Sequence, residues 1–129
     1  MDLKRIIAVD LDGTILKNKK PFMGADDFGK PERKVEDCLR FLKNHGFEIL
    51  IHTTRVNPRL QGLAPALLRM RVSDALDAHK IPFDGIWTGP GKPLAEFYVD
   101  DRGVLYAGDW EKTMREILAR AEKNFKNVY

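Results

Sequence analysis

The chain has 129 residues, of which 43% are hydrophobic and 32% are charged, so its length and composition suit one soluble globular domain with its own core. The net charge of +3 permits anionic substrates but does not by itself indicate nucleic-acid binding. Cys38 is the single cysteine, which excludes an internal disulfide and favours a reducing, cytoplasmic location. No apolar run predicts a membrane span, and the residues after Met1 do not have the pattern of a leader.

Residues 6–16, IIAVDLDGTIL, predict a buried strand that ends in two closely spaced carboxylates. The aliphatic run from Ile6 to Val9 is typical of a strand covered on both faces. Asp10 follows this run, and Asp12 with Gly13 is a turn signal. Two like charges so close together are unfavourable unless a cation or a shared proton compensates them. The pattern therefore predicts a ligand that offsets the repulsion between these two carboxylates.

The middle of the chain predicts a flap, two helices and a strand. The polar, glycine-bearing stretch from Lys17 to Pro31 is interpreted as a loop or flap. Phe47 to His52 predict a second strand, and a second helix is expected to begin near Pro65, because proline is tolerated in a first turn. The first helix is expected to stop at Gly46, and its apolar residues recur at i, i+3, i+4 and i+7, with Cys38 in the core: Val35, Cys38, Leu39 and Leu42.

The last third predicts three short strands and a helix. The strands are expected to end near Thr88, at Asp100 and at Tyr106, the last of them comprising residues 104–106. The final helix carries its apolar residues on one side: Met114, Ile117, Leu118, Ala121 and Phe125. Alternating strands and helices predict an α/β fold with a mostly parallel, five-stranded sheet covered on both faces.

Polar residues follow three of these strands, and ligands of parallel sheets gather at the carboxyl ends of the strands. Asp10 ends the first strand, residues 53–55 (Thr-Thr-Arg) end the second and residues 100–102 (Asp-Asp-Arg) end the fourth, with Lys92 just upstream. Clustered oxygen ligands suit Mg²⁺, which takes one or two carboxylates and keeps waters for a phosphate. A lysine and a threonine beside them supply donors for phosphoryl oxygens. The sequence therefore predicts a site for a divalent metal and a phosphate.

These residues resemble the four ordered motifs of the haloacid dehalogenase-like (HAD) superfamily. The motifs are residues 10–14 (Asp-Leu-Asp-Gly-Thr), Thr53 after an aliphatic strand, Lys92, and the pair Asp100 and Asp101, and they span nearly the whole chain. The resemblance implies a Rossmann-like three-layer α/β/α sandwich. Since dehalogenases of the superfamily lack an acid at the position of Asp12, it also implies a phosphatase or phosphotransferase.

The resemblance implies a role for each motif residue. Asp10 would be the nucleophile that forms an aspartyl-phosphate, and Asp12 the general acid and then the base. Thr53 and Lys92 would hold the phosphoryl group, and Gly13 would let backbone amides approach it. The Mg²⁺ ligands would be Asp10, the Asp12 carbonyl and Asp100, with Asp101 binding directly or through water. Thr54 and Arg55 are further candidates for substrate binding, and Arg55 could equally form a structural ion pair.

The spacing of the motifs leaves no room for a folded cap domain, so the chain is expected to form one capless domain over residues 1–129. Capless relatives tend to act on large substrates, such as phosphorylated proteins or nucleic-acid ends, or to use a neighbouring subunit as a lid. We therefore expect a phosphorylated small molecule or macromolecular end as substrate, and self-association remains open as a way to complete the site. The alternatives are an interaction module of the same fold with weak or no turnover, and a receiver-like module phosphorylated on aspartate, for which the order of the acidic motifs is wrong.

Overall fold

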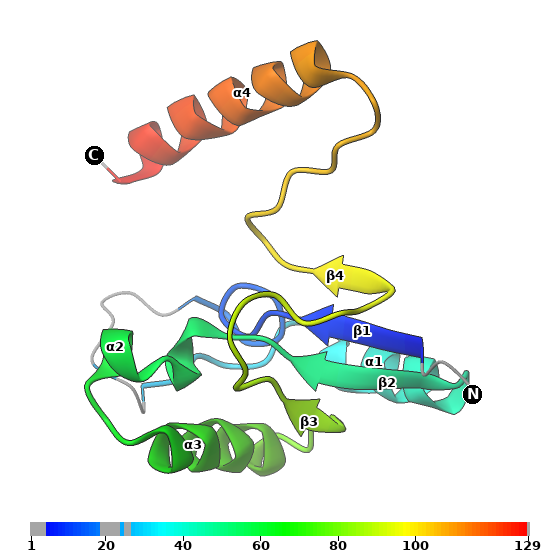
Figure 1. Ribbon diagram of the computed structural model, residues 1–129, viewed down its shortest axis with the longest axis vertical. Coiled ribbons are helices and arrows are strands. Elements are labelled where there is room, and N and C mark those ends of the chain that lie inside the picture. Colours follow the sequence, from blue (N-terminus) through cyan, green and yellow to red (C-terminus); the bar gives the residue numbers. More distant parts are fainter. Residues whose placement is uncertain (1–4, 19–23, 25–26, 129) are drawn as a thin grey trace.

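The computed structural model describes residues 5–18, 24 and 27–128, with side chains described up to residue 124. Within these residues the centre is a parallel sheet of four strands in the order β3-β2-β1-β4 (Figure 1). The strands are β1 (Arg5–Val9), β2 (Phe47–Ile51), β3 (Gly85–Ile86) and β4 (Phe97–Val99). This order puts the strands that precede Asp10, Thr53 and Asp100 side by side, with β1 between β2 and the edge strand β4.

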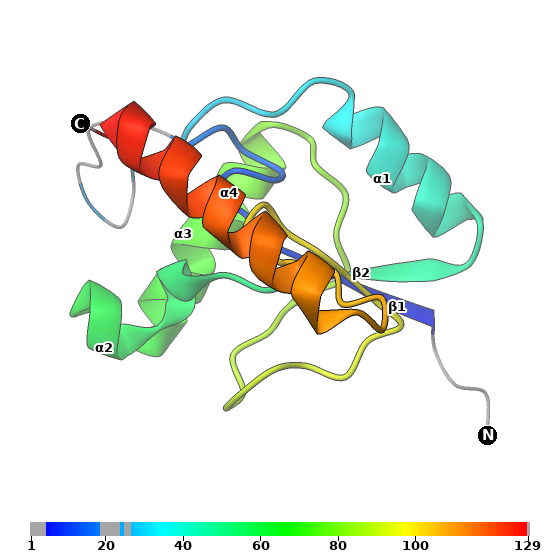
Figure 2. The same cartoon turned by 90° about the horizontal axis from the view of Figure 1, so that it is seen from above.

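Helices α1 (Val35–Asn44) and α3 (Pro65–Ala78) follow β1 and β2 and contribute to the same core cluster. Ile7 pairs with Ile49 in register, and both are buried in the cluster that also contains Leu39 of α1 and Val72 of α3. Because β1, β2 and β3 follow one another in one direction across the sheet, right-handed crossovers place both helices on one face. Figure 2 shows α1 and α3 from above. Two short elements, η1 (Thr54–Val56) and α2 (Pro58–Gln61), lie between β2 and α3.

The helix boundaries agree with the sequence signals. Helix α1 is followed by His45 and by Gly46, whose positive φ of 92° suits glycine. Helix α3 begins at Pro65, as predicted. The prediction that Cys38 belongs to the core is wrong, because its side chain is exposed whereas Leu39, one residue on, is 6% exposed. The buried stripe of α1 is therefore narrower than its apolar periodicity indicated.

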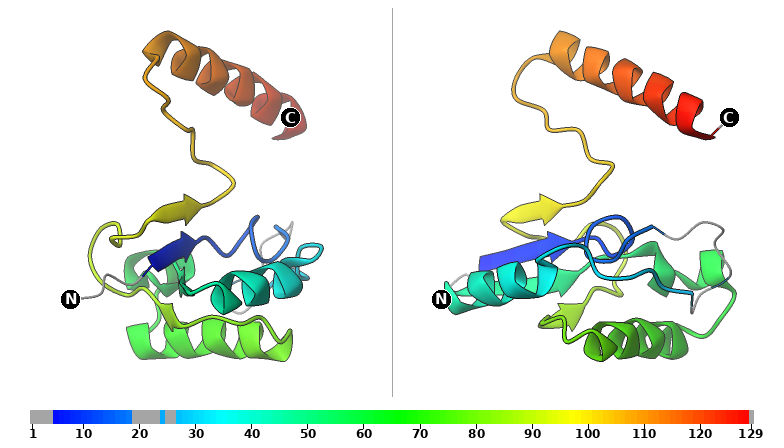
Figure 3. Two further views of the ribbon diagram at one scale, coloured as in Figure 1. Left: turned by 90° about the vertical axis from the view of Figure 1, so that its right-hand side faces the viewer. Right: turned by 180° about the vertical axis from the view of Figure 1, so that it is seen from behind.

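Helix α4 (Trp110–Val128) stands away from the sheet, beyond β4 (Figures 1 and 3). Its apolar side is exposed at Met114, Ile117 and Leu118. Residues 104–106 form no strand, so the sheet has four strands rather than the predicted five. The helical layer expected on the second face of the sheet is likewise not formed by the described residues, because the segment after β4 leads away from the body.

The predicted flap is closed at its base. Leu16 and Pro31 form an isolated antiparallel bridge, and the backbone N–H of Lys17 donates to the carbonyl of Lys30 at 2.7 Å. The two arms approach so closely that a Cβ at Gly29 would overlap the backbone carbonyl of Lys17. Residues 19–23 and 25–26 of the flap lie outside the described residues. The predicted flap boundaries at residues 17 and 31 thus coincide with the point at which its two arms pair.

Among the described residues, no helix combines the length and the apolar character needed to cross a lipid bilayer.

Candidate active site

The loop after β1, which carries Asp10 and Asp12, is anchored in the hydrophobic core. Leu11, Ile15 and Leu16 are fully buried, and the backbone N–H groups of Ile15 and Leu16 both donate to the Leu11 carbonyl at 3.0 Å. The backbone N–H of Leu11 in turn donates to the Asp10 carboxylate at 2.9 Å. Because the apolar side chains of this turn are anchored in the core, the two acids on either side of Leu11 have defined positions.

Gly13 allows the loop after β4 to approach the loop after β1. Its φ of 83° is a left-handed conformation that glycine adopts without strain, and a Cβ there would overlap the carboxylate of Asp101. Asp101 is therefore the member of the acidic pair that lies beside the first loop. The carboxylate of Asp100 accepts hydrogen bonds from the backbone N–H groups of Arg102, at 3.0 Å, and of Gly103.

The carboxyl group of Asp10 has a strongly perturbed affinity for protons. Its partial burial raises the pKa to about 6, from an ordinary value of 3.8. The hydrogen bond from Leu11 acts in the opposite direction, whereas the nearby carboxylates of Asp101 and Asp12 raise the pKa further. The acids after β1 and β4 thus repel one another, as the sequence predicted for such spacing.

The raised pKa of Asp10 gives an expectation for stability. Folded Asp10 keeps its proton up to about pH 6 and unfolded Asp10 loses it near pH 4, so the folded state binds more protons between these values. The free energy of unfolding, measured without metal, is therefore expected to fall as pH rises from about 4 to about 6 and then to level off. The Asp10→Asn variant should lack this component. Melting temperatures of both proteins across this range test the expectation, and parallel curves would contradict it.

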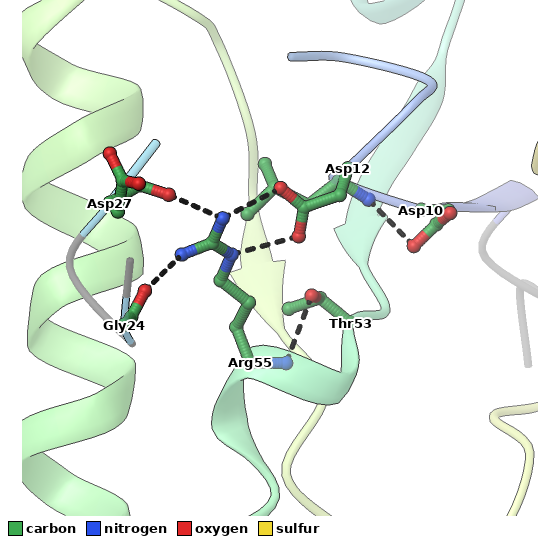
Figure 4. Close-up of polar contacts among 7 residues, drawn as sticks. Asp10, Asp12, Gly24, Asp27, Thr53 and Arg55 are labelled. Atoms are coloured by element: carbon green, nitrogen blue, oxygen red, sulfur yellow. Dashed lines mark hydrogen bonds and ion pairs between the residues drawn. The ribbon is translucent and has the colours of Figure 1, made fainter. Parts of the chain in front are cut away.

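The end of β2 holds Asp12 through an ion pair. Arg55 is 3% exposed, and its Nε and Nη2 donate to the two carboxylate oxygens of Asp12 at 2.8 and 2.9 Å (Figure 4). Thr53 is 8% exposed, and its hydroxyl accepts a hydrogen bond from the backbone N–H of Arg55 at 3.1 Å. Thr54, by contrast, is exposed at the start of η1. Of the two predictions for Arg55, the structure contains the ion pair.

A pocket of about 250 Å³ opens at the carboxyl ends of β1, β2 and β4. Within it, the ammonium group of Lys92 lies 3.8 Å from the centre of the Tyr98 ring, and the Tyr98 hydroxyl donates to the Pro93 carbonyl at 2.6 Å. These contacts position a loop lysine at the sheet edge. The pocket is lined by Ala8, Asp10, His52, Lys92, Tyr98, Val99 and Asp100.

His52 is a lining residue that the sequence interpretation assigned to strand packing. Side chains alternate across a strand, and Ile49 and Ile51 are fully buried among the core residues of the helical face. His52 therefore belongs to the opposite side of the sheet. That alternation was the signal in the sequence that could have placed it at the site.

No family model matches the chain, and no curated protein sequence matches it. Among solved structures, a crystal structure of a protein from Vibrio cholerae is 27% identical, covers 86% of this chain and 94% of its own, and has a TM-score of 0.53. A conserved protein from Bacteroides thetaiotaomicron is 22% identical over 96% of both chains, with a TM-score of 0.55. A D,D-heptose 1,7-bisphosphate phosphatase from B. bronchiseptica, complexed with magnesium and phosphate, is 16% identical over 92% of this chain and 64% of its own, with a TM-score of 0.44.

The topology and the order of the polar residues at the strand ends agree with the resemblance seen in the sequence. The chain has an α/β fold with a central parallel sheet, shared with the proteins from Vibrio cholerae and Bacteroides thetaiotaomicron, and the resemblance to the haloacid dehalogenase-like superfamily stays a prediction from the sequence motifs. In this fold, Asp10, Lys92 and Asp100 line one pocket, while Asp101 adjoins Gly13. Thr53 is buried next to Arg55, which carries Asp12. The functional roles of these residues stay predictions.

The acids of the candidate site fit a magnesium ion in their chemistry. Among the described residues, no group of three or more His, Cys, Asp or Glu side chains could hold a metal. Mg²⁺ does not require such a cage, because it is commonly held by one or two carboxylates, with waters and substrate phosphate completing its shell. The repulsion among Asp10, Asp12 and Asp101, seen in the raised pKa of Asp10, is what a divalent cation would relieve.

Proposed function

We propose that this chain is a Mg²⁺-dependent phosphomonoesterase that acts through an aspartyl-phosphate on Asp10. The observation that carries the proposal is the pocket at the carboxyl edge of the sheet, which brings Asp10 together with Lys92 and Asp100. A partly buried carboxylate facing a lysine suits nucleophilic attack on a phosphate ester, because the lysine attracts the anion that the carboxylate must attack.

In the first half-reaction, a carboxylate oxygen of Asp10 attacks phosphorus, and the bond from phosphorus to the ester oxygen breaks. The leaving alcohol takes its proton from Asp12, which must be protonated for this step, so one of its two oxygens leaves the hydrogen bond from Arg55 while it carries the proton. Asp12 is two residues from the nucleophile, on the rigid loop anchored by Leu11. The products of this half are the free alcohol and the acyl phosphate on Asp10.

In the second half-reaction, a water attacks the phosphorus of the aspartyl-phosphate, and the bond to the Asp10 oxygen breaks. Asp12, now a carboxylate, accepts the proton of that water and is ready for the next cycle. Inorganic phosphate leaves and the carboxylate of Asp10 is restored. One residue thus serves as acid and then as base.

The phosphoryl group needs donors that do not react with it. Lys92 is available in the pocket and supplies a positive charge, and the hydroxyl of Thr53 follows β2 at the same edge. Gly13 is proposed to let the backbone of its loop approach the phosphoryl group, and in this structure its own N–H donates to the Leu16 carbonyl at 2.7 Å. Thr54 is proposed as a further contact to the substrate, whereas Arg55, which is buried and paired with Asp12, is not.

Asp10, the Asp12 carbonyl and Asp100 are the proposed ligands of the metal, with Asp101 bound directly or through water. The ion would neutralise charge on the phosphoryl oxygens, which lowers the barrier to attack by an anionic nucleophile. The carboxylates themselves keep the positions described above, and their mutual repulsion gives the site its affinity for a cation.

The proposed substrate class rests on the prediction that the spacing of the motifs leaves no room for a cap domain. Between Thr53 and Lys92 the chain forms only η1, α2, α3 and β3, which belong to the core domain. A small phosphate ester would find few groups to hold it besides those that grip its phosphate, so a larger phosphorylated molecule or a macromolecular end is favoured. A second subunit that covers the site is the other way to hold a small substrate.

The proposed function is tested by a phosphate-release screen with Mg²⁺ over sugar phosphates, nucleotides, 3′-phosphorylated oligonucleotides and phosphopeptides. We expect turnover, with the highest kcat/KM for a larger substrate. The oligomeric state, measured by light scattering, separates a monomer from an assembly that closes its own site. Binding of phosphorylated ligands with no turnover in the whole panel would favour an interaction module instead.

A further inference from the structure

Arg55 is a buried cation that connects the catalytic loop to the flap. Its side chain is 3% exposed, so its charge is removed from water and depends on neighbouring groups for compensation. Two of its N–H groups donate to the two oxygens of Asp12, at 2.8 and 2.9 Å. This forked geometry holds the Asp12 carboxylate in one orientation, as paired hydrogen bonds to a planar guanidinium do.

Other contacts of the Arg55 side chain lead to the flap. Nη2 donates to the carbonyl of Asp27 at 2.6 Å, and Nη1 donates to the carbonyl of Gly24 at 3.3 Å (Figure 4). The guanidinium carbon lies 4.3 Å from the centre of the Phe28 ring, in a cation–π contact. One side chain therefore binds an acid of the β1 loop and three residues of the flap.

Arginine is required for this arrangement. The guanidinium offers five N–H donors in a plane and can stack on an aromatic ring, whereas a lysine offers one point charge. A lysine at position 55 cannot bind both oxygens of Asp12 and also reach the carbonyls of Gly24 and Asp27. Arg55→Lys therefore keeps the positive charge at position 55 but removes the hydrogen bonds that connect Asp12 to the flap.

We propose that Arg55 is a positioning residue that couples the orientation of Asp12 to the attachment of the flap at Gly24, Asp27 and Phe28. The proposal rests on the proposed function for the role of Asp12, but the coupling itself is a property of the folded chain. Loss of Asp12 should loosen the flap, and loss of the flap contact should misplace Asp12. The attachment of the flap and proton transfer by Asp12 are thus linked through one guanidinium.

The coupling is tested first without any substrate, by limited proteolysis with a lysine-specific protease. Cleavage after Lys17 reports release of the flap, because the backbone N–H of Lys17 must leave the Lys30 carbonyl before the chain can enter the protease. In Arg55→Lys we expect cleavage there to rise by about tenfold or more, because a buried ion pair and two carbonyl contacts are lost. In Phe28→Leu, which removes the ring alone, a rise of about fivefold is expected. Arg59→Lys, the same change at an exposed arginine of α2, is the matched control: it adds a cleavage site at position 59, as Arg55→Lys does at position 55, and should leave cleavage in the flap at the wild-type rate.

Asp12→Asn distinguishes coupling from simple anchoring. Asparagine cannot pair with both arms of the guanidinium as an ion, so the flap should be cleaved faster although the change is in the β1 loop. Asp101→Asn neutralises the carboxylate beside Gly13 and controls for the loss of one negative charge in the site. Equal flap cleavage in Asp12→Asn and Asp101→Asn would overturn the proposal, as would wild-type cleavage in a folded Arg55→Lys.

Kinetics with p-nitrophenyl phosphate and Mg²⁺ give the second measurement. Arg55→Lys is expected to lower kcat by about tenfold or more while KM changes by less than about twofold, because Asp12 is misplaced but the groups that hold phosphate remain. A raised KM with unchanged kcat would overturn positioning and assign Arg55 to substrate binding. If wild type has no activity, the proposed function fails and the proteolysis still decides the coupling. If Arg55→Lys does not fold, Phe28→Leu and Asp12→Asn carry the same decision.

Discussion

Asp10→Asn is expected to abolish turnover, with a loss of kcat of at least about 10⁴-fold. The amide has nearly the shape of the carboxylate, so the loop after β1 keeps its buried anchors Leu11, Ile15 and Leu16. It lacks the anionic oxygen that attacks phosphorus, so no acyl phosphate can form. Phosphate release under saturating substrate measures the loss, and mass spectrometry of acid-quenched enzyme measures the phosphorylated form.

Asp74→Asn is the matched control, since Asp74 is an exposed carboxylate on α3, away from the carboxyl edge of the sheet. It should retain wild-type kcat. Wild-type enzyme should carry phosphate on Asp10 during turnover, and the Asp10→Asn variant should carry none. An Asp10→Asn enzyme that releases phosphate at the wild-type rate would remove Asp10 from the mechanism.

Removal of divalent metal is expected to abolish activity as completely as the Asp10→Asn substitution does. Without a cation, Asp10 must lose its proton beside Asp12 and Asp101 and then attack an anionic phosphate, and each step brings like charges together. Excess chelator should therefore stop phosphate release, and added Mg²⁺ should restore it. Ca²⁺ should inhibit, because its larger and more flexible coordination shell holds ligands at other distances.

Binding of the same metal should also change the free energy of unfolding, which gives a measurement independent of activity. Mg²⁺ that binds the folded chain raises the free energy of unfolding, and the gain should be larger above about pH 6, where Asp10 is ionised. In Asp10→Asn the gain should be smaller. Full activity in excess chelator, with no effect of Mg²⁺ on melting, would point to a mechanism that does not need the ion.

The central strands could be predicted from the sequence because each is a run of aliphatic residues that is buried in the sheet. β1 and β2 end next to Asp10 and His52, one residue or less from the predicted limits. The fifth strand was not formed, since three residues at 104–106 carry a weak signal and need an adjacent edge to pair with. In the order β3-β2-β1-β4, the strands β2, β1 and β4 are parallel neighbours, so the polar residues at their carboxyl ends lie at one edge of the sheet.

The finer contacts of the site depend on approaches that local patterns do not encode. The ion pair of Arg55 with Asp12 joins residues 43 positions apart, and only the packed sheet brings them together. Sequence reasoning left Arg55 between two roles for that reason. The exposure of Cys38 has a related cause, because periodicity defines an apolar stripe but the neighbouring elements decide how much of it is covered.

The hydrogen bond between Lys17 and Lys30 joins the two ends of the predicted flap and fixes the distance between them. The entropy lost on closing a flexible loop grows only with the logarithm of its length, about 0.6 kcal/mol for each doubling. Insertions at residues 19–23 should therefore cost the domain little stability while the strands continue to hold Asp10 and Lys92. Substrate preference in such a chain can evolve by changes in loop length and composition, separately from the selection that maintains the core.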